Sequence, residues 1–163
     1  MDNSKDAINV GKSQLISSKL LFESGQYRDS VTLSYYAMYS SALALLLKKS
    51  ISPKTHEGTL RQLAKEYVKI GLLSKKTYGY LYDARETRNN SSYGYSKTFT
   101  EEDAEELILQ AEKFINEVET LLWFFNYFLF ILDNDATLKW NNKYGLIDTI
   151  FNWINTRNAR KFN

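Results

Sequence analysis

The stretch from Tyr27 to Lys49 constrains the fold most, because it is a predicted helix with apolar residues on two sides. Residues three and four positions apart share one face of a helix. One apolar stripe consists of Val31, Tyr35, Met38, Ala42 and Leu45, and a second of Tyr36, Ser40, Leu43 and Leu47. A helix that is apolar on more than one side needs burial on more than one side. Other helices must therefore pack on both sides of this segment.

The other periodic segments are also helical in pattern. They predict helices over 4–23, from Thr55 to about Gly71, over 75–90 and from Thr100 to Leu132. Thr100 precedes three acidic residues, which is a capping signal matched to the positive end of a helix dipole. No alternating pattern typical of a strand is present. The sequence predicts an all-α fold, an up-and-down bundle of about five helices with an extra C-terminal helical tail.

The chain divides by composition into a bundle over 4–120 and a different segment over 121–163. The apolar run from Leu121 to Leu132 is about a dozen residues long, short of the roughly 20 needed to span a bilayer. It extends the last bundle helix, so we expect the end of that helix to project or bend. An amphipathic helix is predicted around Ile147, Ile150 and Ile154. A buried or interface segment is favoured over a membrane span.

Composition excludes several functions. The chain has 163 residues, a formal net charge of +2, no cysteine and a single histidine, His56. Thiol chemistry, disulfides and Cys/His zinc sites are therefore excluded, whereas the composition leaves oxygen-ligand sites for magnesium open. We expect neither a bound metal nor a cofactor. A charge this small allows nucleic-acid binding only at a local patch. The polar N-terminus resembles no secretory signal, so a cytoplasmic protein is expected.

The segment before Asn90 has a basic face. Tyr78, Leu81, Arg85 and Arg88 recur at three- and four-residue steps, so both guanidinium groups lie on one side of the helix. A guanidinium group is a planar fork suited to phosphate, which makes Arg85, Arg88 and the adjacent Asn89 candidates for phosphate or RNA binding. The alternative is structural, with Arg88 joining helix ends or pairing with a carboxylate. Local spacing alone favours this alternative.

His56 enters the third predicted helix after Lys54 and Thr55. A histidine at such a position is more often a cap or a surface hydrogen-bonding group than a catalyst. It is also the side chain whose ordinary pKa suits acid–base work near neutral pH. We therefore keep it as a secondary catalytic candidate.

Four segments together resemble the HEPN superfamily, in particular its small stand-alone branch. They are Gly25–Ser30, the Tyr-Tyr-Ala-Met-Tyr run ending at Tyr39, Lys54–His56, and Arg88 with Tyr93-Gly94. The resemblance covers about Ala7 to Val118. It implies a helical bundle that dimerises so that the arginine-bearing helix ends of two protomers meet in one cleft. We expect the second and fourth helices to form this interface, because the second has more apolar surface than one bundle covers, with contacts from Tyr35, Tyr36, Ala37 and Ser40.

The resemblance also bears on catalysis. In HEPN nucleases an arginine is followed, after four to six residues, by the histidine used in metal-independent RNA cleavage. Here Tyr93 follows Arg88 after four residues. A tyrosine, with an ordinary pKa near 10, is a poor base at neutral pH. A related subgroup, partnered by a nucleotidyltransferase, has a tyrosine two residues further on that accepts nucleotidyl groups. Tyr95 occupies that position.

Three hypotheses follow. The leading one is a dimeric HEPN protein that binds RNA or nucleotide phosphate in a toxin–antitoxin-like system with a nucleotidyltransferase, and lacks ribonuclease catalysis. The second is a metal-independent endoribonuclease that uses Arg88 with Tyr93 or His56. The third is a structural helical interaction module whose arginines are paired with carboxylates.

Overall fold

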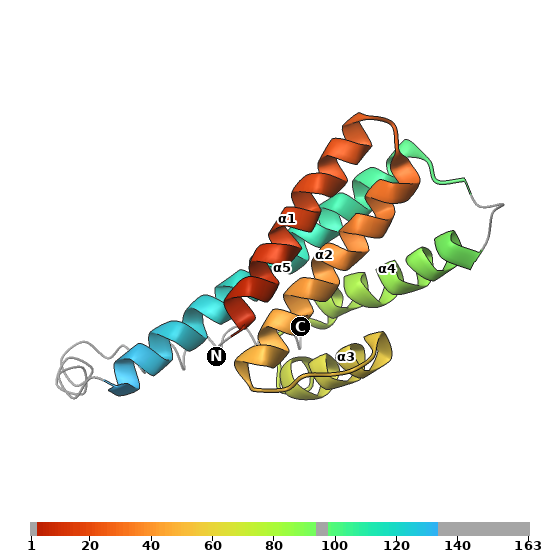
Figure 1. Cartoon of the computed structure of the whole chain (residues 1–163). Coiled ribbons are helices and arrows are strands. Elements are labelled where there is room, and N and C mark those ends of the chain that lie inside the picture. The colour runs from red at the N-terminus through yellow and green to blue at the C-terminus, as the bar shows by residue number, and fades with distance from the viewer. Residues whose placement is uncertain (1–2, 94–97, 134–163) are drawn as a thin grey trace, which may run out of the picture. The chain divides into compact units, whose positions relative to one another are not determined.

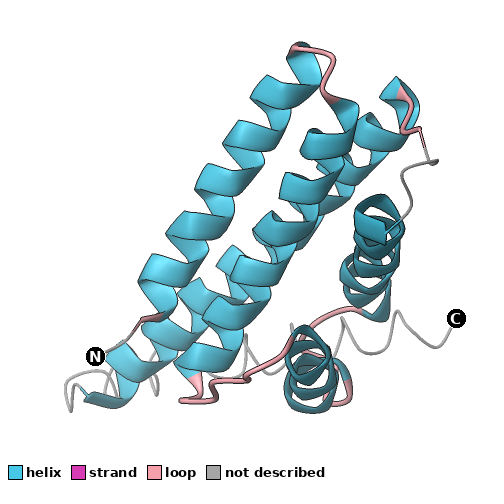
Figure 2. Ribbon diagram, turned by 45° about the vertical axis from the view of Figure 1, so that its right-hand side comes forward, coloured by secondary structure: helices cyan, strands magenta, loops and turns pink. Residues whose placement is uncertain are grey.

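The computed structural model describes the backbone of residues 3–93 and 98–133 and the side chains of residues 3–88 and 98–127. Its helices are α1 (Ser4–Glu23), α2 (Tyr27–Lys48), α3 (His56–Leu63), the π-helical turn η1 (Ala64–Val68), α4 (Lys75–Tyr93) and α5 (Glu101–Asp133). Within these ranges every regular element is a helix (Figure 2), which confirms the predicted all-α bundle. The chain separates into compact units over 1–120 and 121–163. The predicted amphipathic tail lies outside the described residues.

Helices α1 and α2 form a closely packed antiparallel pair (Figure 1). Gly25, in the turn between them, has φ +72°, a conformation that favours glycine. Further along, a Cβ added at Gly11 would lie 2.4 Å from Ser41 Oγ and 2.8 Å from the Ala37 carbonyl oxygen. The absence of a side chain at Gly11 therefore lets α1 approach the backbone of α2.

Serine hydroxyls satisfy one another in this contact. The buried Ser18 hydroxyl of α1 donates to the Ser30 carbonyl at 2.8 Å and lies 2.7 Å from Ser34 Oγ on α2. A second α1 side chain, Gln14, accepts a hydrogen bond of 2.8 Å from Ser40. Small polar residues at the contact are tolerated because each hydroxyl finds a partner.

The opposite side of α2 is covered by α3, η1 and α4. Leu63, Tyr67, Leu81 and Ala84 from these elements are fully buried, and Figure 1 shows α4 alongside α2. One protomer therefore buries the first stripe of α2, whereas Tyr36, Leu43 and Leu47 of the second stripe stay half-buried. The inference that α2 carries more apolar surface than one bundle can cover stays a prediction.

This burial bears on the expected dimer contacts. Tyr35, Ala37 and Ser40 are 2%, 0% and 9% exposed within the protomer, whereas Tyr36 is half-buried. Ala37 and Ser40 face α1, where their backbone or side chain contacts Gly11 and Gln14. Of the four expected interface residues, Tyr36 therefore keeps the most surface for a partner, and the dimer stays a prediction that rests on family resemblance.

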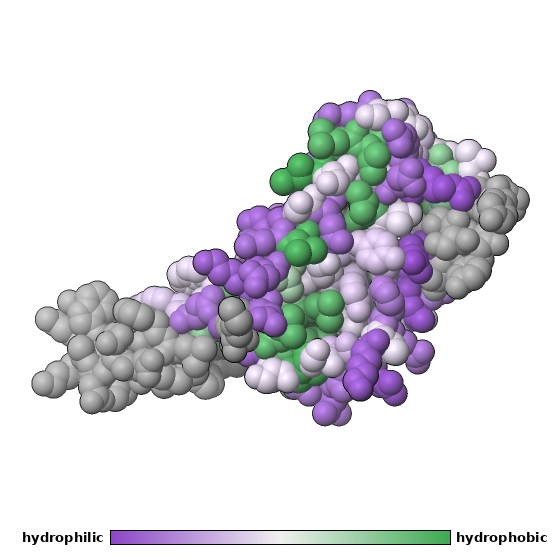
Figure 3. Space-filling view, viewed as in Figure 1, coloured by the Kyte–Doolittle hydropathy of each residue, from purple (hydrophilic) through white to green (hydrophobic). Residues whose placement is uncertain are grey.

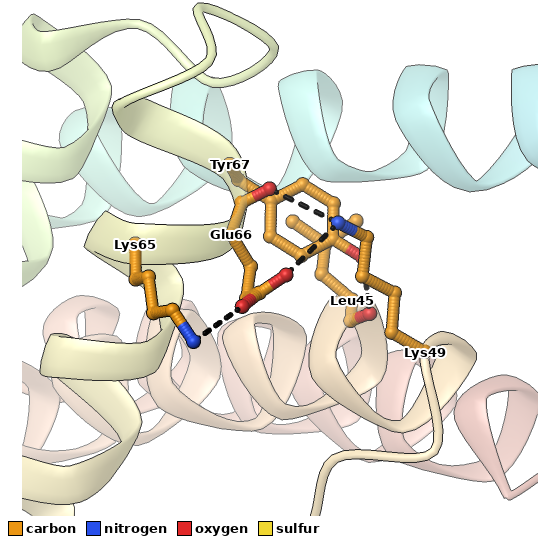
Figure 4. A network of polar contacts seen from close by, with 5 residues as sticks. All are labelled: Leu45, Lys49, Lys65, Glu66 and Tyr67. Atoms are coloured by element: carbon orange, nitrogen blue, oxygen red, sulfur yellow. Dashed lines mark hydrogen bonds and ion pairs between the residues drawn. The ribbon is translucent and has the colours of Figure 1, made fainter.

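A polar network anchors η1 to the end of α2 (Figure 4). Lys49 Nζ lies 3.3 Å from Glu66 Oε2 and 4.7 Å from the centroid of the Tyr67 ring, while Lys65 lies on the other side of the Glu66 carboxylate. The Tyr67 hydroxyl donates to the Leu45 carbonyl, and burial raises the pKa of Tyr67. The expected single helix from Thr55 to Gly71 thus ends at Leu63 and continues as a π-helical turn.

Both predicted helix starts are capped by threonine. Thr55 Oγ1 accepts from the Gly58 backbone N–H at 3.0 Å, which fixes the first turn of α3. At the start of α5, Asp103 N–H donates to Thr100 Oγ1 while Thr100 N–H donates to Asp103 Oδ2, a reciprocal capping box. These contacts confirm the predicted capping.

Within the first unit, the part of α5 that precedes Leu121 contacts α1 and the start of α4 through acidic side chains. Glu119 and Glu112 pair with Lys12 and Lys19 of α1. Glu117 accepts from the Ser74 backbone N–H at 2.9 Å and from the Thr77 hydroxyl of α4. This part of α5 therefore holds α1 and the start of α4 in one bundle.

The surface of the face drawn in Figure 3 is mixed, with apolar patches separated by hydrophilic surface. The exposed large apolar residues of α1 are Val10, Ile16 and Leu20. By length and composition alone, α2 is a helix that could cross a membrane, but 67% of its apolar window is buried inside the bundle. A buried core helix meets the same criterion, so this is weak evidence for a membrane span.

Candidate functional site

Aromatic side chains of α2 surround His56 at the start of α3. The Tyr35 hydroxyl lies 2.6 Å from His56 Nδ1. The Tyr39 ring stacks on the imidazole with centroids 4.2 Å apart and an interplanar angle of 26°, and Tyr36 meets it edge-on at 6.2 Å. We call these four residues the tyrosine–histidine cluster. Tyr35 and Tyr39 can both reach the ring because they are one helical turn apart.

Arg88 of α4 joins this cluster through Tyr36. Arg88 Nη2 donates to the Tyr36 hydroxyl at 2.7 Å, and the guanidinium carbon lies 5.4 Å from the centroid of the same ring. A neutral hydroxyl orients the guanidinium group without cancelling its charge. Arg85, one turn earlier on α4, is 26% exposed and lies 3.8 Å from the exposed Glu86 carboxylate.

The charges of the site act on its titratable groups. Burial lowers the pKa of His56, and the positive charges of Arg88 and Arg85 lower it further. Burial raises the pKa of Tyr35 to about 12, even though the same two arginines oppose this shift. At pH 7 the site therefore combines two cations with a neutral imidazole and a protonated phenol.

The structure brings together candidates that lie far apart in the sequence. His56, Tyr35 and Tyr36 contact one another or Arg88, and Arg85 influences the same imidazole. Sequence reasoning missed Tyr39 as the stacking partner, although its four-residue spacing from Tyr35 was a usable signal. Ala37 and Ser40 face α1 instead.

Three further candidates are only partly placed or not placed. The backbones of Asn89 and Tyr93 belong to the last turns of α4, which continues beyond the predicted end at Asn90. Their side chains, and the whole of Tyr95, lie outside the described residues. Within the described part of the chain no group of three or more histidine or acidic residues is arranged to hold a metal ion.

The structure is an all-α bundle in which an arginine-bearing helix meets aromatic residues and a Thr-His turn. This is the class of protein that the sequence resemblance predicts. The family model for the HEPN domain matches residues 4–121, and the chain belongs to this family. It is 34% identical over 115 residues to Putative toxin MJ0605 of Methanocaldococcus jannaschii, covering 71% of this chain and 85% of that protein.

Two other relatives have a comparable identity to this chain. Putative toxin MJ0142 of the same organism is 32% identical over 71% of this chain and 78% of its own length. A UPF0332 protein of Thermotoga maritima is 32% identical over 64% of this chain and 80% of its own length.

Proposed function

We propose that this chain is a dimeric, toxin-like HEPN protein that binds RNA or nucleotide phosphate and works with a nucleotidyltransferase, without ribonuclease catalysis of its own. The toxin names of two relatives support the biological class. One observation carries the binding role: Arg88 is oriented by Tyr36 beside a neutral His56, with Arg85 one turn away. Cytoplasmic RNA is the natural source of such a ligand.

The chemistry of the cluster suits a nucleotide. Guanidinium groups bind phosphate oxygens through charge-assisted hydrogen bonds. Aromatic faces such as those of Tyr36 and Tyr39 can stack on bases, which is worth about 1–3 kcal/mol per base in single-strand binding. Arg85 and Tyr36 are half-buried, so part of each side chain stays accessible to a ligand.

The absence of a histidine after Arg88 argues against cleavage. Tyr93 would have to act as the base instead, but the ordinary pKa of a tyrosine hydroxyl is near 10, so it keeps its proton at neutral pH. Losing general acid–base assistance typically lowers a rate by about 10²–10⁴-fold.

The second candidate is a metal-independent endoribonuclease in which His56 replaces the missing histidine. One observation favours it: the pKa of His56 is lowered by burial and by Arg88 and Arg85, so the imidazole is neutral at pH 7, as a base must be. His56 comes from a different helix than the family's catalytic histidine, so this would be a different arrangement of the same groups.

Binding and cleavage of a fluorescent single-stranded RNA without added metal test both candidates. Arg88→Ala should weaken binding about tenfold and reduce its salt dependence. Lys19→Ala, which removes one charge from α1, should leave binding within about twofold. Cleavage that is abolished by Arg88→Ala and His56→Gln would establish the second candidate. RNA binding that is indifferent to Arg88 would refute the proposal.

The partner is tested separately. Co-incubation with a candidate nucleotidyltransferase partner, nucleotide and magnesium should add nucleotidyl mass at Tyr95. A phenolic oxygen can take such a group once a base removes its proton. No mass gain, or an equal gain on Tyr95→Phe, would contradict Tyr95 as the acceptor.

A further inference from the structure

The hydrogen bond between Tyr35 and His56 has two arrangements that differ in where the protons are. A neutral imidazole carries one proton, on Nδ1 or on Nε2, and the other nitrogen accepts. A tyrosine hydroxyl can donate or accept. With 2.6 Å between the Tyr35 oxygen and Nδ1, either the phenol donates to Nδ1 or Nδ1–H donates to the phenol.

The surroundings of Tyr35 decide between these arrangements. The side chain is 2% exposed, and leaving a buried hydroxyl proton without an acceptor costs about 1–3 kcal/mol. Within the described part of the chain, His56 Nδ1 is the acceptor within hydrogen-bond distance of the Tyr35 hydroxyl. If Nδ1 carried the proton, the hydroxyl proton of Tyr35 would lose this acceptor.

We propose that Tyr35 is a positioning residue: it donates to His56 Nδ1, holds the neutral imidazole as the Nε2–H tautomer, and so makes His56 a hydrogen-bond donor rather than a base. The final step, donation from Nε2–H to a phosphate held by Arg88, rests on the proposed function. The tautomer itself does not.

The other tyrosines of the cluster help to hold the His56 imidazole in one orientation. Tyr39 covers one face of the imidazole at 4.2 Å, and Tyr36 approaches edge-on at 6.2 Å while it also binds Arg88. The hydrogen bond at one ring nitrogen determines which nitrogen carries the proton. A ring held in this way presents an N–H donor to an anion, which suits binding and opposes proton abstraction through Nε2.

The single histidine of the chain makes the tautomer directly measurable, since a long-range proton–nitrogen NMR spectrum contains one set of imidazole signals for the chain. In the full-length protein at pH 7.5 to 8, we expect a pyridine-type nitrogen shift for Nδ1 and a pyrrole-type shift for Nε2. The reverse assignment, or averaged shifts from an equal mixture, would overturn the proposal.

Two matched variants separate positioning from packing. Tyr35→Phe keeps the ring but removes the donor, so it should give mixed tautomers. Tyr39→Phe keeps the stacking ring and the Tyr35 hydrogen bond, so the parent tautomer should persist. An unchanged pattern in Tyr35→Phe would overturn the role of Tyr35. The spectrum of the unaltered protein stays decisive even if a variant fails to fold.

Titration with inorganic phosphate, followed through the same imidazole signals, tests the ligand step. Phosphate should shift the Nε2 signals of the parent, and Tyr35→Phe should weaken this binding about twofold, because only the Nε2–H fraction of a mixed population presents the donor. No phosphate response in the parent would refute the phosphate role and count against the proposed function, while the tautomer assignment would stand on the free protein.

Discussion

His56 lies near two arginine side chains, so its protonation in the folded chain is unfavourable. The titratable and charged side chains that face its ring come from two helices and are Tyr35, Tyr36, Tyr39, Arg85 and Arg88. Protonation would add a third positive charge beside the two arginines and would require the Tyr35 hydroxyl to become an acceptor. The folded chain therefore prefers the neutral imidazole more strongly than the unfolded chain does.

This preference predicts a pH dependence of stability. The pKa of His56 is 6.5 in the unfolded chain and is lowered from that value in the folded chain. Between the folded and the unfolded pKa the unfolded state binds more protons, so the free energy of unfolding rises with pH. Stability should fall as pH drops from about 7 through 6.5 and below. Urea unfolding between pH 8 and 5 measures it, and His56→Gln should flatten the curve in that window.

Two carboxylates of the described residues also have shifted pKa values, but they titrate below this window. The pKa values of Glu66 and Glu102 are lowered from 4.5, by hydrogen bonds from Lys49 and from the Glu102 backbone respectively, so their contributions are lost only at more acidic pH. An unchanged pH dependence in His56→Gln would show that the imidazole is not responsible.

The Ser18 hydroxyl offers a second test at single-residue resolution. Ser18→Ala removes the shared partner of the Ser30 carbonyl and the Ser34 hydroxyl in a fully buried contact. We expect a loss of about 1–3 kcal/mol in the free energy of unfolding, because buried polar groups lose a partner. Ser13→Ala, at an exposed position of α1, is the control and should stay within about 0.5 kcal/mol.

At the scale of elements, the α1–α2 contact depends on Gly11. A methyl group there would meet the Ala37 carbonyl, a backbone atom that cannot turn away as a side chain can. Gly11→Ala should therefore destabilise the protein by about 1–3 kcal/mol or more. Thermal or urea unfolding measures the change.

Gly79 provides a matched comparison in the interior of α4. Apart from its chain neighbours and the backbone of its own helix, no atom of the described residues lies within 4 Å of a Cβ added there. Gly79→Ala should stabilise the protein by about 0.5–1 kcal/mol, because alanine loses less backbone freedom in a helix. Equal effects of the two substitutions would refute the close approach of α1 and α2 at Gly11.

Local sequence information was enough for most of the elements. Apolar spacing and the caps at Thr55 and Thr100 predicted helices that the structure confirms. The π-helical turn could not be predicted, because it coincides with contacts from Tyr67 and Glu66 to the end of α2, which depend on tertiary packing.

At the site, too, local sequence predicted some features, while others depend on tertiary packing. Helical spacing placed Arg85 and Arg88 on one side of α4, and it assigned Tyr35 and Tyr36 to the two apolar stripes of α2. The contact between His56 and Tyr35 joins α3 to α2 and depends on where the connection after Lys49 places α3. The tyrosine–histidine cluster could therefore be recognised only in the folded structure.

For the molecule as a whole, the predicted dimer needs a surface that the protomer leaves uncovered. On α4, Tyr82 is an exposed large apolar residue. If the arginine-bearing helices of two protomers meet, the chain should sediment as a dimer at micromolar concentration, and Tyr82→Glu should shift it towards monomer because like charges would face each other across the symmetry axis. A monomeric parent would contradict the dimer.

Helix α5 completes the bundle from a distant part of the chain, since its ion pair between Glu119 and Lys12 spans 107 positions. Long-range pairing of this kind forms late, whereas the α1–α2 pair is local. During synthesis at about 5–20 residues per second, α1 and α2 would emerge on the order of ten seconds before α5 is complete. For that time the nascent chain exposes the α5-facing side of α1 to its surroundings, so the ribosome-bound stage is when this protein is most open to chaperones and to early pairing with another chain.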